Sequence, residues 1–178
     1  MDIKAHMAEH LKTIRKTKAL SLDATAKLTG VSKAMLGQIE RQESSPTIAT
    51  LWKIASGLNT SFSAFMVAED SVRIAEKTFP DDPNMQIHTL FAYNPQTQFE
   101  MFEITLSGFH QQMSAPHGVG VIEHVIIIEG ELAVFCDGKW LTLGCGQRCR
   151  FFADQIHGYH AVSETAVFHN IVSYPLDR

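Results

Sequence analysis

Small or polar side chains recur at helical spacing in a short segment of the chain. They are Lys33, Ala34, Gly37, Gln38 and Arg41. Positions 33 and 37, like positions 34 and 38, are four residues apart, so a helix would place these side chains on one face. Amide and cationic groups can hydrogen-bond base edges and phosphates, and no large apolar group obstructs a close approach. This spacing therefore predicts a surface that enters a DNA groove.

Two short helices joined by a tight turn must position this surface. The first is expected over residues 21–29 and the second over residues 32–41, with Gly30 in the turn between them. Ser21 and Ser32 stand where a hydroxyl oxygen can accept the free N–H groups that open a helix. We therefore add both serines to the predicted DNA-binding residues.

The opposite face of the second helix is expected to be apolar. The predicted core of the pair consists of Leu36, Ile39 and Val31 packed against Leu22, Ala26 and Leu28. A third helix is expected to start at Ser45-Pro46 and to cover the pair. The alternative is an ordinary helical hairpin whose polar face is merely solvated. The paired serine caps, the glycine turn, the polar face and the third helix together favour a DNA-binding motif.

The segments VSKAMLGQIER and SSPTIATLWKIASGL resemble the XRE (lambda repressor and Cro-like) helix-turn-helix domain. The residues that this resemblance places at base edges are Lys33, Ala34 and Gln38. It also implies a buried ion pair between Arg15 and Glu40, for which the alternative is an exposed charge at the end of the helix. Gly37 departs from the family pattern, in which a serine is common, and glycine inside a helix costs about 1 kcal/mol relative to alanine.

Charge is distributed unevenly along the 178 residues. Residues 1–53 contain nine Lys or Arg against five Asp or Glu, whereas residues 71–178 contain six against twelve. A basic first part attracts phosphate, so DNA binding should weaken steeply with salt. The chain is long enough for two domains, and we expect an all-α domain over residues 1–70, a linker over residues 71–85 that contains Pro80 and Pro83, and a second domain over residues 86–178.

Short alternating runs replace the helical periodicity in the second part of the chain. They cover residues 86–93, 99–106, 123–128, 132–136, 140–143 and 166–174. Asp137-Gly138 lies between two of these runs and predicts a tight hairpin. Six or more strands at this spacing predict an all-β sandwich or barrel.

Residues 114–132 and 143–160 concentrate the chemistry of this second domain, and they resemble the two motifs of the cupins, which are double-stranded β-helix (jelly-roll) proteins. The resemblance implies that Glu123 and His117 stand at two metal-ligand positions of the first motif and His157 at that of the second. The usual fourth ligand is missing, because Val119 occupies its position. A metal would therefore have three protein ligands at most, unless His124 or His110 bends in.

Two histidines and one carboxylate would leave an open coordination position, which suits zinc or iron. The alternative is a metal-free pocket in which His117 and His157 form hydrogen bonds or pack inside the barrel. Tyr159 shares strand parity with His157, so it is expected to face the same cavity. The predicted ligand-binding residues are thus His117, Glu123, His157 and Tyr159.

The combined pattern resembles bacterial transcriptional regulators in which a small β-barrel senses a metabolite. This resemblance implies a homodimer that binds a double-stranded operator and a small-molecule effector, for which a sulfur-containing amino acid is preferred. One alternative is a cupin metalloenzyme, a dioxygenase or isomerase, with an appended DNA-binding domain. Another is a regulator, such as an antitoxin, whose β-domain holds a partner protein.

The cysteines and the apolar runs indicate the cellular compartment in which the protein is expected. Cys136, Cys145 and Cys149 form an odd number without a CxxC pair, so we expect reduced thiols rather than a disulfide framework. The chain has no secretory signal, and its longest apolar run is too short to cross a bilayer, so a cytoplasmic protein without membrane contact is expected.

Overall fold

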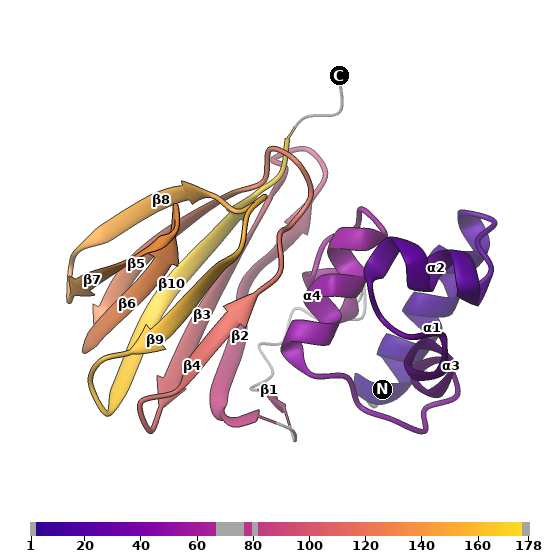
Figure 1. Cartoon of the computed structure of the whole chain (residues 1–178), viewed down its shortest axis with the longest axis horizontal. Coiled ribbons are helices and arrows are strands. Elements are labelled where there is room, and N and C mark those ends of the chain that lie inside the picture. The colour runs from indigo at the N-terminus through magenta and orange to yellow at the C-terminus, as the bar shows by residue number, and fades with distance from the viewer. Residues whose placement is uncertain (1–2, 67–76, 80–81, 176–178) are drawn as a thin grey trace. The chain divides into compact units, whose positions relative to one another are not determined.

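The computed structural model describes residues 3–66, 77–79 and 82–175 and divides the chain into two compact units, Met1–Arg73 and Ile74–Arg178. The first unit is helical and the second consists of strands (Figure 1). The expected change from helix to strand is therefore confirmed. No helix in the described parts of the chain is both long enough and apolar enough to span a membrane.

Residues 3–66, the part of the first unit that the structure describes, form four α-helices and one 3₁₀ turn. They are α1 (Ile3–Thr17), α2 (Leu22–Thr29), α3 (Lys33–Glu40), α4 (Ile48–Gly57) and η1 (Ser63–Phe65). Ser21 accepts the N–H of Ala24 at 3.1 Å and Ser32 accepts that of Met35 at 3.2 Å, so both predicted caps are confirmed. Gly30 ends α2 with a φ of 66°, a left-handed conformation that glycine adopts without steric cost.

The packing of α2 differs from the expected pattern. Leu28 is 55% exposed, whereas Thr25 and Thr29 are buried. Each threonine hydroxyl donates to the carbonyl oxygen four residues earlier, so burial leaves no unpaired donor. Helix α4 begins at Ile48, two residues after the expected first position, Pro46. Thr47 rather than Ser45 precedes the helix, and its hydroxyl accepts the N–H of Thr50.

The described part of the second unit, residues 77–79 and 82–175, contains ten strands. They are β1 (Lys77–Phe79), β2 (Asp82–Asn94), β3 (Phe99–Ser107), β4 (Gln111–Ser114), β5 (Ile122–Glu129), β6 (Glu131–Cys136), β7 (Lys139–Gly144), β8 (Arg148–Phe152), β9 (His157–Ala161) and β10 (Thr165–Ser173). The larger sheet has the order β1-β2-β3-β10-β5-β8 and the smaller sheet the order β4-β9-β6-β7. The two sheets lie face to face (Figure 1).

Six of these strands match the expected runs, and the remaining ones lie in shorter or more polar segments. Asp137 and Gly138 have φ angles of 51° and 73°, so the predicted hairpin between β6 and β7 has positive φ at both turn residues. β1 and the first residues of β2 fall inside the segment expected to be a linker. Pro83 is tolerated there because it stands near the start of a strand.

Strict alternation along the central strands creates the interior of this unit. Every second residue of β3 and of β10 is buried, and the inward positions are mostly apolar, as in Phe102 and Phe168. One inward position in each of β3, β5 and β10 is polar: Glu100, Glu123 and Asn170 are also buried. A buried polar group must be hydrogen-bonded or ionically compensated, so these positions lead to the functional site.

Candidate functional site

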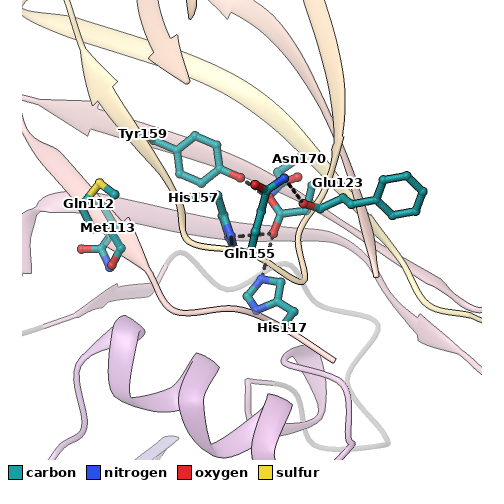
Figure 2. Close-up of polar contacts among 9 residues, drawn as sticks. Gln112, Met113, His117, Glu123, Gln155, His157, Tyr159 and Asn170 are labelled. Carbon is teal, nitrogen blue, oxygen red and sulfur yellow. Dashed lines mark hydrogen bonds and ion pairs between the residues drawn. The ribbon is translucent and has the colours of Figure 1, made fainter. Parts of the chain in front are cut away.

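The predicted cupin residues meet between the two sheets (Figure 2). Glu123 extends from β5, His157 and Tyr159 from β9, and His117 from the loop between β4 and β5. Glu123 and His157 are each 1% exposed, and Tyr159 and His117 are also buried. The structure therefore brings together all four residues that the sequence proposed for ligand binding.

A loop held by backbone hydrogen bonds carries His117 to the site. The N–H of His117 donates to the carbonyl oxygen of Ala153 at 2.8 Å, which ties this loop to the segment after β8. Val119, at the missing ligand position, is 88% exposed. Among the described residues, His117, Glu123 and His157 are the group of side chains arranged for a metal ion, with donor atoms within 4.8 Å of one another. Neither His110 nor His124 joins this group.

The two oxygens of the Glu123 carboxylate have different surroundings. Oε1 lies 2.9 Å from His117 Nε2 and 3.4 Å from His157 Nε2. Oε2 accepts hydrogen bonds from the Tyr159 hydroxyl and from Asn170 Nδ2, the latter at 3.0 Å (Figure 2). One oxygen therefore faces the histidines, and the other faces neutral hydrogen-bond donors.

The tautomer of His157 follows from its second nitrogen. Nδ1 lies 2.9 Å from the carbonyl oxygen of Gln155, which can only accept, so Nδ1 carries the hydrogen. In the neutral ring, Nε2 is then a bare lone pair, and it makes no hydrogen bond within the described parts of the chain. A lone pair that faces the Glu123 carboxylate at 3.4 Å is unfavourable unless a cation, either a proton or a metal ion, lies between the two acceptors.

The pKa shifts agree with a requirement for positive charge. Burial alone would raise the pKa of Glu123, but the positive charges of His157 and His117 and the hydrogen bond with His117 hold it well below its usual value. Burial would lower the pKa of His157, yet Glu123 and the Gln155 carbonyl raise it overall. Burial and the neighbouring carboxylate raise the pKa of Tyr159 well above its usual value, so its hydroxyl remains a donor.

Asn170 is a member of this site that sequence reasoning missed. Its Nδ2 donates to Glu123 and lies 3.3 Å from the Tyr159 hydroxyl. Asn170 is 2% exposed in the middle of β10. An amide at an inward position of an otherwise apolar alternating strand was the available signal, because such a group needs a buried partner.

The predicted DNA-reading surface lies on the exposed side of α3. Ser32, Lys33, Ala34, Gln38 and Arg41 are exposed, as is the first cap, Ser21. The exception is Gly37, which is buried: a Cβ there would lie 3.0 Å from Arg41 Nη1, so the arginine side chain covers it. Gly37 therefore does not contribute open surface, as the helical spacing had suggested.

Both cationic side chains of this surface, Lys33 and Arg41, form ion pairs with carboxylates. Lys33 Nζ lies 2.7 Å from Asp23 Oδ2, and Arg41 forms a two-point contact with Glu43 at 2.8 Å and 2.7 Å. These pairs are exposed. The carboxylates occupy the hydrogen-bonding positions that a phosphate would need.

The implied ion pair between α1 and α3 is present. Arg15 Nε and Nη2 donate to the two oxygens of Glu40 at 2.6 Å and 2.8 Å, and the side chains are 16% and 10% exposed. Arg15 Nη1 also donates to the carbonyl oxygen of Leu20 at 3.0 Å. This two-point geometry fixes α3 against α1.

The cysteines contribute no ligand to the buried group. Cys136 is buried, Cys149 is partly buried, and all three thiols are free. Burial raises the pKa of Cys149 to about 12, so this thiol is protonated at neutral pH. Cys145 is exposed, and its Sγ lies 3.0 Å from the carbonyl oxygen of Ile128.

A capped helix-turn-helix followed by a two-sheet β domain with a buried His-Glu-His group defines a regulator with separate DNA-binding and cupin domains. The chain belongs to the XRE family of helix-turn-helix transcriptional regulators, in the form that carries a C-terminal cupin domain. A family profile described as "Helix-turn-helix" matches residues 11–65. The chain is 49% identical to the HTH-type transcriptional regulator SutR of Escherichia coli (strain K12) over 166 residues, 93% of each protein.

Solved structures extend the likeness to both domains. The crystal structure of an HTH_3 family transcriptional regulator from Vibrio cholerae is 60% identical, with a TM-score of 0.93 over 98% of this chain and 99% of that one. The Cupin_2 domain of an XRE family transcriptional regulator from Enterobacter cloacae is 39% identical, with a TM-score of 0.50. That match covers 52% of this chain and 98% of the other. The predicted fold class, an all-α helix-turn-helix domain followed by an all-β cupin domain, is confirmed.

Proposed function

We propose that this regulator is a cytoplasmic homodimer that binds a specific operator and whose cupin domain senses a small metabolite. The observation that carries the sensor function is the buried contact between His157 Nε2 and Glu123 Oε1 at 3.4 Å, which needs a proton or a metal ion between the two atoms. Burying an ionised carboxylate among histidines is costly, and an inert barrel would fill this space with apolar side chains. The arrangement is explained if the site exists to bind a cation or a polar ligand.

The DNA-binding part of the proposal assigns base readout to the exposed face of α3. Gln38 is exposed in the second half of the helix, and Lys33 and Ala34 begin its first turn. The glutamine amide can pair with an adenine edge, and Lys33 can reach guanine or phosphate. Ser21 and Ser32 are exposed at the N-termini of α2 and α3, where free backbone N–H groups can contact phosphate.

The proposed metal is one divalent ion, zinc or iron, held by His117, Glu123 and His157. Two nitrogen donors and one oxygen donor leave at least one coordination position for a metabolite or water. The hydrogen bond from His157 Nδ1 to the Gln155 carbonyl fixes the ring so that Nε2 faces the site. Metal binding would place a cation between the two facing acceptors.

The effector would act by binding one arrangement of the two DNA-reading domains in a dimer better than another. A difference of about 1–3 kcal/mol between the two arrangements is enough for regulation. The family resemblance favours a sulfur-containing amino acid as the effector. A thiolate or thioether can occupy an open position on zinc or iron, which supports that preference chemically.

The second candidate function is a cupin metalloenzyme, a dioxygenase or isomerase with an appended DNA-binding domain. The observation that favours it is the group of two histidines and one carboxylate, which is a common ligand set of non-haem iron oxygenases. The similar proteins reported above are named as transcriptional regulators, which favours the sensor. Oxygen uptake that requires iron and a substrate would support the enzyme.

Native mass spectrometry of protein purified without chelator or nickel resin would test the proposal first, because it records oligomer, metal and retained metabolite together. A dimer that carries a low-mass metabolite supports the sensor. A metal-loaded, metabolite-free protein directs the next experiment to oxygen uptake.

Coupling is then measured by fluorescence anisotropy on an operator selected from random DNA. Titrations contain zinc or iron(II), with L-cysteine or L-methionine as probes and L-serine or L-norleucine as matched controls without sulfur. If operator affinity is the same with each metal and each amino acid, these probes are not effectors and the proposed coupling to sulfur-containing amino acids is wrong.

A further inference from the structure

The two oxygens of the Glu123 carboxylate have different partners: Oε1 faces the two histidines, whereas Oε2 accepts hydrogen bonds from two neutral donors. We propose that Tyr159 and Asn170 are positioning residues that occupy Glu123 Oε2 and thereby restrict Glu123 to ligation through Oε1. The inference rests on the proposed metal function of the site. Tyr159 and Asn170 would determine which oxygen of Glu123 binds the metal and would not bind the metal themselves.

Counting hydrogen bonds shows why Oε2 is withdrawn from ligation. A carboxylate oxygen has two lone pairs, and Oε2 accepts one hydrogen bond from the Tyr159 hydroxyl and one from Asn170 Nδ2. The second hydrogen of Nδ2 can reach the Tyr159 oxygen at 3.3 Å, so the amide also orients the phenol. Oε2 is therefore saturated, and the lone pairs of Oε1 remain directed at the histidines.

The fold builds this restraint from both sheets. Glu123 is on β5 and Asn170 on the adjacent β10, where the register pairs Asn170 with Val125, two residues beyond Glu123. Tyr159 reaches the same oxygen from β9 in the opposite sheet. Because all three side chains are at most 4% exposed, water cannot readily replace either donor.

A carboxylate that ligates through one oxygen leaves a metal with a smaller coordination number and more room for an exogenous ligand. Freeing Oε2 would allow two-oxygen ligation and close one of those positions. It would also remove the orientation of Oε1. Loss of such outer hydrogen bonds typically weakens metal binding by about 10-fold to 100-fold.

The test uses cobalt(II) as a spectroscopic probe for the full-length protein, with visible absorption read as the metal is titrated anaerobically. Tyr159→Phe removes one donor and keeps the ring, and Asn170→Leu removes the other with similar volume. Each variant is expected to bind cobalt about 10-fold to 100-fold more weakly. The combined variant is expected to show weaker visible bands, because cobalt absorbs less strongly as its coordination number rises.

Tyr174→Phe is the matched control, since the Tyr174 hydroxyl donates to another buried carboxylate, Glu100, which is outside the metal-binding group. It should keep the wild-type cobalt affinity and spectrum. Thermal unfolding of each metal-free variant separates loss of folding from loss of positioning. If Tyr159→Phe does not fold, Asn170→Leu carries the same test.

The outcomes distinguish this inference from the function on which it rests. If wild-type protein binds cobalt and both folded single variants match it in affinity and spectrum, Tyr159 and Asn170 are not positioning residues, although the metal site stands. If wild-type protein itself leaves cobalt with the spectrum of the aqueous ion, the proposed metal function fails and this inference fails with it.

Discussion

The proposed DNA-reading face of α3 and the buried site of the cupin domain both contain charged groups in contact, but those charges have opposite exposure to water. On α3, Lys33 meets Asp23 with side chains that are 59% and 64% exposed. In the cupin domain, Glu123 meets two histidines at 1% exposure. Water competes with the Lys33–Asp23 contact, so either partner can be exchanged for another charged group. Water is excluded from Glu123, so hydrogen-bond donors or a cation must balance its buried charge.

The two regions therefore differ in how strongly ligand binding depends on individual side-chain atoms. An exposed face can exchange an internal carboxylate for a DNA phosphate with little change in burial, so its pairs are easily replaced. The buried site has no such freedom, because Glu123 must always have donors or a cation around it. Ligand selection should therefore be sensitive to single atoms in the cupin domain and more tolerant on α3.

Replacement of the central carboxylate should give the largest effect. Glu123→Gln keeps the shape of the side chain but removes the charged oxygen between the histidines, so zinc affinity should fall at least about 100-fold. Competition with a chromophoric chelator would measure it. Gln38→Ala, on the exposed face, should retain wild-type zinc affinity. Equal zinc affinity for Glu123→Gln and wild type would mean that the two regions do not differ as described.

A base-reading substitution should give the next largest effect, limited to DNA. Gln38→Ala is expected to reduce the preference for the selected operator over random DNA by about 10-fold to 100-fold, because an amide can bond two atoms of one base edge. Anisotropy titrations on both DNAs give this ratio. Lys16→Ala, on α1, should weaken binding to both DNAs similarly if it contacts phosphate. Equal losses on both DNAs for Gln38→Ala would exclude it from base readout.

The sequence predicted the exposed region well because its signals are local. Ser21, Ser32 and Gly30 act within four residues of the groups that they cap, and the structure places each cap as expected. Two wrong predictions for this region concern which side chains are buried. Arg41 folds back over Gly37, and Thr25 rather than Leu28 enters the core, since helical spacing does not specify which neighbour covers which face.

The buried site was only partly predictable because its contacts cross the fold. Motif resemblance brought His117, Glu123 and His157 together, and strand parity added Tyr159. Asn170 is 47 residues from Glu123 in the chain, and their contact depends on β10 lying beside β5. That pairing is set by sheet topology, for which the sequence carried no local signal.

The ion pair between α1 and α3 is less exposed than the pairs on α3 and more exposed than the Glu123 contacts. Its removal should therefore have an effect of intermediate size. Arg15→Met leaves Glu40 partly buried without its two-point donor, so the helix-turn-helix domain should lose about 1–2 kcal/mol of unfolding free energy. Urea unfolding followed by Trp52 fluorescence in a Trp140→Phe background reports on this domain alone. Arg148→Met, at an exposed position of β8, should leave that transition unchanged. A stability as high as wild type for Arg15→Met would place the pair with the exchangeable surface contacts.

The smallest expected effect concerns the carboxylates that pair with the exposed cations. Asp23→Asn and Glu43→Gln free Lys33 and Arg41 for phosphate and remove a negative charge from the DNA-facing side. Each variant should bind random DNA about two-fold to five-fold more tightly, with a salt dependence steeper by up to about one phosphate contact. Anisotropy titrations between about 50 mM and 200 mM salt would measure both.

Glu164→Gln is the matched charge control, because Glu164 is an exposed residue of the cupin domain, in the loop between β9 and β10. It makes the same change in net charge, so an equal gain in DNA affinity would assign the effect to overall charge rather than to the two ion pairs. A gain confined to Asp23→Asn and Glu43→Gln would show that α3 meets DNA by exchanging one carboxylate partner for a phosphate. The buried site could not make such an exchange, because its partners are fixed by strands of both sheets.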